Sequence, residues 1–534
     1  MASRQDVFCD GEASSIVFSP QADCLAVTTS QGIGIYDAET LERRVLLPVA
    51  GTLAASFSTT GAFLVTQNRP AKGVENDRNL RVWRVSDGEA VLGLHQKNFN
   101  REEWPSIKFG PEDRFAYHRV TNNVHAYDCS TFQGVAHRIP IPSLASFAPC
   151  PVERQGAKIA AYCPEIKSSP ASVGVYAADP GSNGQMICRK SFFRSNSAQL
   201  MWSPKGGSVL ALALSDVDAT NQSYYGEQKL YYLAADGKKD CAVELPKSGP
   251  IHDVQWSPRG DYFVVVAGFM PAKAILFSHT CVPKFDLGKC ILEGSGRWAF
   301  TSADQETRSG PYSLVRWNPF GRYFVLAGFG NLPGDLAFYE VAQKSGNCKR
   351  IGATRAENGV ALEWSPDGQK VLISTTAPRL RVDNGIRVVR ADAKLLAQKA
   401  YPLLLQAAWR PVPPGTFQDK ALDIPKDQAD GQAAPAVPEA PPAPKGYVPP
   451  HLRNNPAAAA AARAKFSLAR DENDRGGKIV SGVKAAATPA APVKPVRVIP
   501  GLPPEEAKPK APKKAKRKTK AKQAQEGVAN LSIQ

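Results

Sequence analysis

The stretch WSPRGDYFVVV, residues 256–266, contains the pattern that decides the fold. It begins with a large aromatic residue, Trp256, which we expect to end one strand and to pack between sheets. Ser-Pro-x-Gly then makes a tight turn, because proline fixes φ and glycine permits positive φ. The run YFVVV that follows is rich in aromatic and β-branched residues, which favour a buried strand. The stretch therefore predicts two consecutive strands joined by a tight turn.

The same pattern recurs along the first 410 residues of the chain. Its nine copies are marked by the aromatic residues Phe18, Phe57, Phe109, Phe147, Trp202, Trp256, Trp317, Trp364 and Trp409. Their spacing averages about 49 residues, close to the repeat of about 40–45 residues that is typical of WD-type propeller blades. Further strand-like segments, such as residues 80–85, 336–341 and 386–389, follow turn-forming residues inside the repeats.

Four strands per repeat are typical of a β-propeller, so we expect an all-β, WD40-like β-propeller over residues 1–412. Nine copies of the pattern favour nine blades. Eight blades are the alternative, because the copy around Phe147 is poorly marked. A solenoid built from the same repeats would need polar capping units, and none is visible in the sequence.

The positive charge of the chain is concentrated towards its C-terminal end. The 534 residues carry 66 Lys and Arg against 49 Asp and Glu, a formal net charge of +17. Residues 411–534 hold 21 of these cations, 11 of the anions and 20 of the 44 prolines, whereas the first 410 residues hold 45 cations and 38 anions. We therefore expect a nearly neutral folded body and, over residues 413–534, a disordered basic tail rich in Pro and Ala.

Several classes of protein find no support in the sequence. It contains no stretch of 18 apolar residues that could span a membrane, and its first residues lack an apolar core of signal-peptide length. The ten cysteines are scattered without a CxxC pair, which indicates reduced, mostly buried thiols in a cytosolic or nuclear protein. No Walker loop, GxSxG or HxxxH pair occurs, so we expect no enzyme, no cofactor and no metal site. A hydrolytic propeller would need carboxylates that converge only in three dimensions.

A run of basic residues in the tail is the strongest functional signal. Nine of the fifteen residues from 508 to 522 are basic: Lys508, Lys510, Lys513, Lys514, Lys516, Arg517, Lys518, Lys520 and Lys522. Such a run does not fold alone, and it attracts the phosphates of a nucleic-acid backbone with a strong dependence on salt. Lysine favours point-charge contact with a backbone over the reading of bases. We expect this run to bind RNA; a nuclear localisation signal and a solubilising tail are the alternatives.

A second tail segment, GYVPPHLR at residues 446–453, combines aromatic, apolar and basic residues in a Pro-rich context. Segments of this composition are typical of short docking motifs. We assign partner docking to the residues Tyr447, Pro449, Pro450, Leu452 and Arg453. An extended linker is the alternative interpretation.

Loops that follow the second strand of several repeats should emerge together on one face of a propeller. They include residues 67–73, 268–273, 328–334 and 376–382, and three of the four carry Lys or Arg. A basic face formed in this way would suit a phosphate backbone. Ordinary solvated loops are the alternative.

Three stretches resemble the eukaryotic translation initiation factor 2A family: AGFGNLPG at 327–334, WSPDG at 364–368 and APRLRVDNG at 377–385. The resemblance spans roughly residues 10–412 and reaches the tail motif at residues 447–453. The third stretch is the most specific, since a propeller has no general need for Arg-Leu-Arg in that loop. We therefore assign contact with RNA or the ribosome to Arg379 and Arg381.

This resemblance implies a nine-bladed propeller that acts in translation initiation in the cytoplasm without hydrolysing GTP. Members direct initiator methionyl-tRNA to the small ribosomal subunit on selected mRNAs, so we expect these partners and other initiation factors, a monomeric protein and no membrane. The end of the chain departs from the family, because Pro and Ala interrupt the Lys run where members carry a longer charged helical region. The alternative is a propeller scaffold of a multiprotein translation or RNA-processing complex. The propeller subunit of initiation factor 3 is of that kind, but it resembles this chain only in architecture.

Overall fold

The computed structural model describes most of residues 13–422. Within that range it leaves out residues 71–73, 75–76, 155, 167–168, 216–225, 247–248, 288–290, 293–297, 300–309 and 378. The described residues form strands and loops with one short 3-10 helix, Pro111–Asp113. They contain no helix that is long and apolar enough to cross a membrane.

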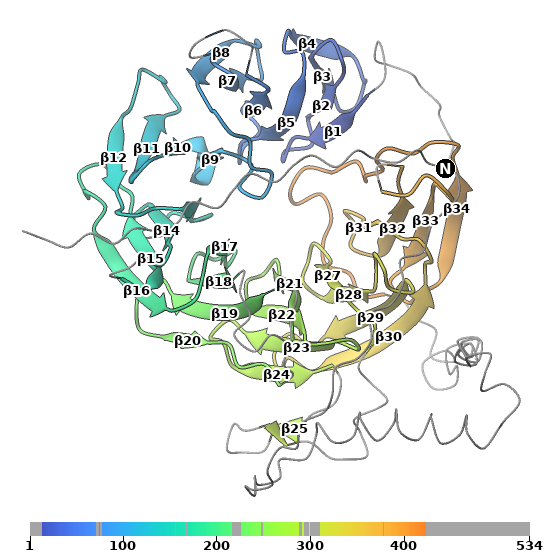
Figure 1. Ribbon diagram of the computed structural model, residues 1–534. Coiled ribbons are helices and arrows are strands. Elements are labelled where there is room, and N and C mark those ends of the chain that lie inside the picture. The colour runs from blue at the N-terminus through green and yellow to red at the C-terminus, as the bar shows by residue number, and fades with distance from the viewer. Residues whose placement is uncertain are drawn as a thin grey trace, which may run out of the picture. The chain divides into compact units, whose positions relative to one another are not determined.

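Eight four-stranded antiparallel sheets stand side by side around a ring (Figure 1). The strands of each sheet follow one another in chain order, as they do in the blades of a propeller. The first strand of a blade lies nearest the centre and the fourth lies outermost, as β9 (Ile107–Phe109) and β12 (His137–Pro140) show in Figure 1. The prediction of an all-β propeller is therefore confirmed.

The first four blades contain strands β1 to β16. Blade 1 consists of β1 (Ser15–Phe18), β2 (Cys24–Thr28), β3 (Ile33–Asp37) and β4 (Arg43–Leu47). Blade 2 consists of β5 (Thr52–Phe57), β6 (Phe63–Asn68), β7 (Leu80–Arg84) and β8 (Ala90–Leu94). Blade 3 consists of β9, β10 (Phe115–Val120), β11 (Asn123–Asp128) and β12. Blade 4 consists of β13 (Ser146–Pro149), β14 (Lys158–Cys163), β15 (Ala171–Ala177) and β16 (Met186–Phe192).

The second four blades contain strands β17 to β34, with one short hairpin between blades 6 and 7. Blade 5 consists of β17 (Ser197–Trp202), β18 (Ser208–Ser215), β19 (Glu227–Ala234) and β20 (Asp240–Ala242). Blade 6 consists of β21 (Ile251–Trp256), β22 (Tyr262–Ala267), β23 (Lys273–Ser278) and β24 (Pro283–Asp286). The hairpin pairs β25 (Ile291–Leu292) with β26 (Trp298–Ala299). Blade 7 consists of β27 (Leu314–Trp317), β28 (Tyr323–Ala327), β29 (Asp335–Val341) and β30 (Cys348–Arg355). Blade 8 consists of β31 (Ala361–Trp364), β32 (Lys370–Thr375), β33 (Gly385–Arg390) and β34 (Leu395–Ala400).

The repeated aromatic residue ends the first strand of seven blades, while in blade 4 Phe147 is the second residue of β13. In the later blades the aromatic residue also links its blade to the preceding one. The indole nitrogens donate to backbone carbonyls beside the preceding blade's aromatic residue: Trp202 to Ala148 (2.9 Å), Trp256 to Met201 (3.2 Å), Trp317 to Gln255 (3.4 Å) and Trp364 to Arg316 (2.9 Å). A buried indole N–H usually needs such an acceptor. The recurring tryptophan is therefore both a packing residue and a link from blade to blade.

Where a serine or asparagine follows the repeated aromatic residue, its side chain accepts a hydrogen bond from the start of the second strand. The Ser257 hydroxyl is buried and accepts a hydrogen bond from the backbone N–H of Tyr262 at 3.2 Å. Asn318 does the same for Tyr323 at 3.0 Å. Gly260 completes the turn with φ +66°, a conformation that favours glycine. The Ser-Pro-x-Gly pattern thus satisfies a buried donor at the point where the second strand begins.

The hydrophobic core lies between neighbouring sheets. Between blades 6 and 7, Val264 and Leu276 belong to one buried cluster with Val315 and Phe324. Phe324 stacks on Tyr339 with ring centroids 5.2 Å apart. Burying one such side chain stabilises the fold by about 1.5–3 kcal/mol. The interfaces between blades therefore supply much of the stability of the ring.

The meander order of the strands separates the connections onto two faces. The turn face carries the turns between first and second strands, such as residues 257–261, and those between third and fourth strands. The loop face carries the loops between second and third strands, such as residues 328–334 and 376–384, together with the connections from blade to blade. We use these two names below.

The prediction of nine blades was wrong, because eight four-stranded sheets form and the ninth copy of the pattern builds no sheet. Trp409 does continue the series of tryptophan hydrogen bonds between successive repeats, since its indole N–H donates to the Glu363 carbonyl at 3.2 Å. No strand follows it among the described residues up to 422. Its sequence explains this result: Pro411, Pro413 and Pro414 lack the N–H that a strand needs, and no apolar run follows. The weakly marked copy at Phe147, in contrast, begins the complete blade 4.

Side chains from the segment after blade 8 close the ring. Gln406 contacts the backbone of Ile16 in β1 twice, accepting from its N–H at 3.0 Å and donating to its carbonyl at 2.9 Å. The chain then reaches the turn face of blades 6 and 7, where Asp419 accepts from Arg259 and Arg322, each at 2.8 Å. Among the described residues, the Gln406 side chain thus supplies the hydrogen bonds that join the segment after blade 8 to β1.

Candidate nucleic-acid interface

The loop at residues 376–384 joins β32 to β33 and is held at both ends. The buried Asn384 donates its amide N–H to the Leu380 carbonyl at 2.9 Å, and its amide oxygen accepts from the Leu404 N–H at 3.0 Å. At the other end the Ala377 N–H donates to the Leu404 carbonyl at 2.7 Å. Asn384 therefore fixes the shape of the loop that carries Arg379 and Arg381.

Arg379 and Arg381 both project from this loop as exposed side chains. Neither guanidinium forms an ion pair with any residue that the structure describes. Arg379 lies against Gly330 of the neighbouring blade, since a Cβ placed on Gly330 would be only 3.0 Å from its Nη2 atom. An unpaired guanidinium presents a planar set of donors that suits a phosphate or a carboxylate. The loop therefore offers two charges to an external anion.

The neighbouring loop at residues 328–334 has a shape that only glycine permits. A Cβ on Gly328 would lie 1.8 Å from the Pro311 carbonyl oxygen, which no side chain can tolerate. Phe329 is half-buried, and a Cβ on Gly359 would lie 2.6 Å from its ring. The structure thus brings together the AGFGNLPG and APRLRVDNG stretches, which belong to blades 7 and 8. Sequence reasoning singled out both stretches but did not predict their contact.

A cavity of about 230 Å³ lies beside the arginine loop, between the connection of blades 7 and 8 and strands β33 and β34. Its polar lining includes Asn358, Thr375, Asp383, Arg387, Gln398 and Lys399. Asn358 donates to Asp383 at 3.1 Å, and the Thr375 hydroxyl donates to the Asn358 carbonyl at 2.9 Å. The mixture of cations, amides and hydroxyls can meet the hydrogen-bonding groups of a sugar or a phosphate.

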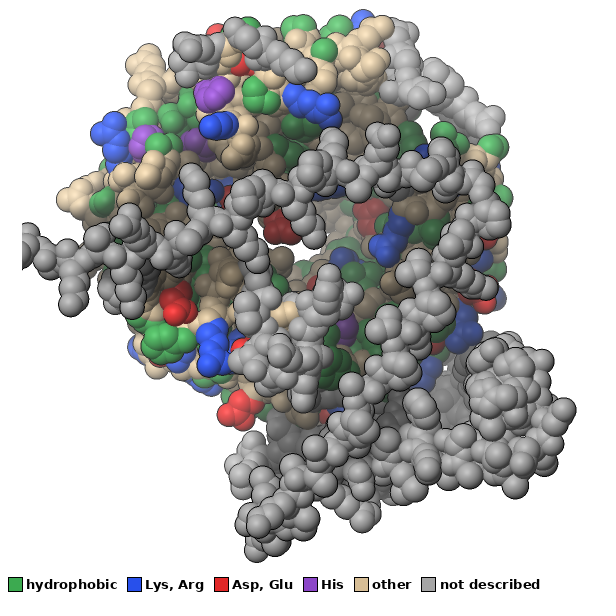
Figure 2. Space-filling view, in the orientation of Figure 1, with side chains coloured by type: hydrophobic (Ala, Val, Ile, Leu, Met, Phe, Trp, Pro, Cys, Tyr) green, Lys and Arg blue, Asp and Glu red, His purple; other side chains and the backbone are tan. Residues whose placement is uncertain are grey.

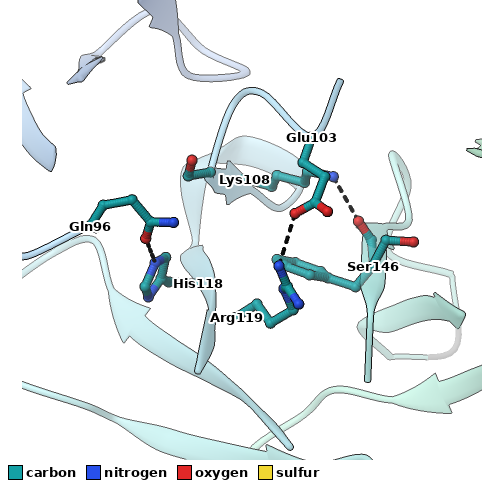
Figure 3. Close-up of a pocket in the computed structure, with 8 residues that line it drawn as sticks. Gln96, Glu103, Lys108, His118, Arg119 and Ser146 are labelled. Carbon is teal, nitrogen blue, oxygen red and sulfur yellow. Dashed lines mark hydrogen bonds and ion pairs between the residues drawn. The ribbon is translucent and has the colours of Figure 1, made fainter. Parts of the chain in front are cut away.

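A second, smaller cavity lies between blades 2, 3 and 4 and contains two buried basic groups (Figure 3). The Lys108 ammonium donates to the Phe147 carbonyl at 2.7 Å, and burial lowers the pKa of Lys108. Burial also lowers the pKa of His118 to about 4, so this imidazole is neutral at pH 7. The volume, about 40 Å³, has room for only a few water molecules. We interpret this cavity as polar packing between blades rather than as a ligand site.

Charges of both signs are interspersed over the side of the ring seen in Figure 2, without one continuous basic patch. The loops that the sequence analysis grouped as a basic face contain acidic neighbours as well, such as Glu357 and Asp383. Arg379 and Arg381 are two exposed guanidiniums on one anchored loop, whereas other exposed arginines without an ion-pair partner among the described residues, such as Arg154, stand on other blades. Among the described residues, no group of three His, Cys, Asp or Glu side chains could hold a metal ion.

Comparison with known proteins places this geometry in a family. The family model for eukaryotic translation initiation factor eIF2A matches residues 190–293 and 301–407. Eukaryotic translation initiation factor 2A of Dictyostelium discoideum is 31% identical over 454 residues, which cover 84% of this chain and 68% of the relative. That of Schizosaccharomyces pombe is 31% identical over 472 residues, covering 86% and 75%. The chain belongs to the eIF2A family.

A solved structure supports the fold of this eIF2A family member. It is described as the crystal structure of the eukaryotic initiation factor, with 29% sequence identity and a TM-score of 0.65. The match covers 76% of this chain and 92% of the solved one. The resemblance drawn from three short stretches is thereby confirmed, and the protein is a translation initiation factor by family.

The sequence analysis also assigned functions in the tail of this eIF2A family member, and these lie outside the described residues. They comprise the basic run at residues 508–522 and the docking segment at residues 446–453. The tail assignments therefore stay predictions. Asn384, in contrast, is a positioning residue that the sequence analysis missed, although an Asn before Gly at the end of a loop is a recognisable turn signal.

Proposed function

We propose that this eIF2A family member binds the small ribosomal subunit in the cytoplasm and promotes delivery of initiator methionyl-tRNA on selected mRNAs. It does so without hydrolysing GTP and without catalysis of its own. Membership in an initiation-factor family supports the process, and the arginine loop of blade 8 supports contact with RNA. The propeller acts as the docking body, and the basic tail run at residues 508–522 acts as an electrostatic arm on RNA phosphates.

The observation that carries this proposal is the pair of exposed, unpaired guanidiniums at Arg379 and Arg381. Some exposed arginines elsewhere on the ring, such as Arg84 and Arg114, have carboxylate partners within 2.8 Å. Others, such as Arg69 and Arg154, have no such partner among the described residues but do not share an anchored loop. A guanidinium without an internal partner binds a phosphate without first breaking an ion pair. Two such groups on an anchored loop also lose little conformational entropy on binding.

The test is cosedimentation of the full-length protein with purified small ribosomal subunits over a series of salt concentrations. We expect Arg379→Ala/Arg381→Ala to weaken association by about tenfold or more, because each charge-assisted hydrogen bond contributes about 1.5–3 kcal/mol. The slope of log K against log salt should fall by about 1 for each arginine. The matched control is Arg84→Ala/Arg114→Ala, which removes the same charge from the turn face.

A neutralised tail, with the nine basic residues from 508 to 522 changed to Gln, separates the two assignments. We expect it to weaken association and to flatten the salt dependence, since it removes several phosphate contacts. Equal affinities and slopes for the wild type and the Arg379→Ala/Arg381→Ala variant would overturn the assignment to these two arginines. An unchanged slope after neutralising the tail would overturn the assignment of the run.

A scaffold role is the second candidate, and one observation favours it. A subunit of eukaryotic translation initiation factor 3 from Xenopus laevis is 23% identical over 414 residues, which cover 77% of this chain and 56% of that protein. A scaffold would retain its protein partners after ribonuclease treatment of a cell extract. Loss of every partner on ribonuclease treatment would favour RNA contact instead.

A further inference from the structure

Two cysteines from neighbouring blades meet near the outer edge of the ring. Cys241 lies in β20, the outermost strand of blade 5, and Cys281 lies in the turn between β23 and β24 of blade 6. Both are free and half-buried, and a hydrogen bond links their thiols. They are 40 positions apart in the sequence, so no CxxC pattern marks them.

Several contacts between the two blades hold these cysteines in place. The Lys239 ammonium donates to the Thr280 carbonyl at 2.6 Å, and the Tyr232 hydroxyl donates to the His279 carbonyl at 2.9 Å. Tyr232 is also the residue directly opposite Cys241 in the sheet. Both cysteines pack against one apolar cluster that includes Tyr232. The thiols are therefore brought together by the packing of the blades.

The turn that carries Cys281 is well defined but unusual for this residue type. Cys281 has φ +58°, in the left-handed region that favours glycine and asparagine. Its N–H donates to the Ser278 carbonyl at 2.9 Å, and the Val282 N–H donates to the Ser278 hydroxyl at 3.1 Å. A conformation that glycine would adopt more easily thus holds a thiol next to Cys241.

The two thiols differ in acidity, which suits them to different roles. The hydrogen bond from Cys281 lowers the pKa of Cys241 to about 7, and the nearby Lys239 and Lys190 act in the same direction. Donating that hydrogen bond raises the pKa of Cys281, and burial adds to the effect. Burial alone raises the pKa of Cys348 to about 12. Cys241 is therefore the more acidic of the two thiols, and a thiolate is the reactive form.

We propose that Cys241 and Cys281 form a peroxide-sensitive pair that closes into a disulfide between blades 5 and 6. The Cys241 thiolate attacks one oxygen of a hydroperoxide, so that an S–O bond forms and the O–O bond breaks. The leaving oxygen takes up a proton and departs as water or an alcohol, and Cys241 becomes a sulfenic acid.

The second step uses the neighbouring thiol as the resolving group. Cys281 gives up its proton and attacks the sulfenic sulfur, so that the S–S bond forms, the S–O bond breaks and water leaves. The two thiols together supply the two electrons that reduce one hydroperoxide. A dithiol reductant reverses the change by thiol–disulfide exchange. This inference does not depend on the proposed contact with RNA.

The test treats the reduced full-length protein with hydrogen peroxide and maps its tryptic peptides without reduction. Cys241 lies in the peptide 240–247 and Cys281 in the peptide 274–284. We expect the two peptides to appear as one cross-linked mass that disappears on adding dithiothreitol. Cys281→Ser should lose the cross-link and leave a sulfenic acid on Cys241 that dimedone labels. Cys188→Ser is the control and should leave the cross-link unchanged.

The pH dependence of the first step provides a second readout in the unmodified protein. Because the pKa of Cys241 is lowered, its rate of reaction with iodoacetamide should rise with pH and level off at a lower pH than that of an ordinary thiol. Cys188, whose pKa burial raises, should react more slowly throughout. The proposal is overturned if peroxide gives no cross-linked mass in the wild type. It is also overturned if Cys241 reacts no faster than Cys188.

Discussion

The turn between β7 and β8 of blade 2 and the loop between β32 and β33 of blade 8 differ in what their arginine side chains contact. On the turn face, Arg84 pairs with Asp87 at 2.8 Å and with Glu89 at 2.7 Å. On the loop face of blade 8, Arg379 and Arg381 are exposed and have no ion-pair partner among the described residues. Exposed ion pairs add only about 0–1 kcal/mol each to stability. Their main effect is to cancel the local field, so the difference shows where charge stays available for a partner.

The loop face has ion pairs of its own, which makes the difference a local one. Arg355 pairs with Asp335 at 2.6 Å, and Arg119 pairs with Glu103 at 2.9 Å. Arg69 and Arg78, between β6 and β7 of blade 2, are also exposed without an ion-pair partner among the described residues. Arg379 and Arg381 differ from them in standing together on a loop that Asn384 anchors.

The largest effect is expected for Asn318→Ala on the turn face. Asn318 accepts from the Tyr323 N–H and donates to the Gly368 carbonyl at 3.3 Å, and both groups would lose their partner. We expect a loss of about 2–4 kcal/mol in the free energy of unfolding, measured by urea denaturation. RNA affinity of the folded fraction should not change. Asn347→Ala is the control, because Asn347 is exposed in the turn between β29 and β30 of the same blade. A similar loss for both variants would contradict this account.

A smaller effect on stability is expected for Asn384→Ala on the loop face, together with a loss of binding. Removing the amide leaves the Leu404 N–H and the Leu380 carbonyl without their partner, at a cost of about 1–2 kcal/mol. The loop then no longer holds Arg379 and Arg381 in one shape. Cosedimentation should show a weakening close to that of the double arginine variant. Wild-type affinity would mean that the loop needs no anchoring to bind.

The smallest effect is expected when the pH is lowered, and it concerns Asp392 in the turn between β33 and β34 on the turn face. Arg379 and Arg381 on the loop face stay charged over the same pH range, because arginine does not lose its proton. Burial raises the pKa of Asp392, but hydrogen bonds from Arg390 and the Lys394 N–H outweigh it and hold the pKa below its usual value. A carboxyl whose pKa is lower in the folded state stabilises the protein above the unfolded pKa, about 3.9, and this contribution is lost as the pH falls further. Melting temperature should therefore drop more steeply for the wild type than for Asp392→Asn between about pH 5 and about pH 3. Parallel curves would contradict this expectation.

Much of the fold could be predicted because the residues that form the first strand, the turn and the second strand of a repeat are close together in the sequence. The aromatic residue and the turn of residues such as 256–260 depend on neighbours in the sequence. Seven blades begin as the pattern predicts, whereas in blade 4 β13 runs past Phe147 to Pro149 and β14 begins only at Lys158. The number of blades could not be read in this way, because Trp409 matches the pattern while the chain after it lacks the residues to build a sheet. Counting marked turns therefore overestimates blades by one.

The candidate site was predictable only in part. The Arg-Leu-Arg loop was found because its composition is unusual for a propeller loop. Its contact with Gly330 and the pairing of Cys241 with Cys281 depend on how neighbouring blades pack. One sequence carries no signal for such contacts, since the residues are separated by dozens of positions and follow no shared spacing.

Ring closure between Ile16 and Gln406 joins residues 390 positions apart, and this has a consequence during synthesis of the protein. A chain grows at about 5–20 residues per second, so β1 waits roughly 20–80 s for its partner to emerge. Until then Ile16 and Phe18, which line an apolar hollow with Leu372 and Trp409 in the finished ring, face no neighbouring blade. The nascent chain therefore carries an exposed apolar edge while 390 of its 534 residues are added, and this is the period in which a chaperone would be needed most.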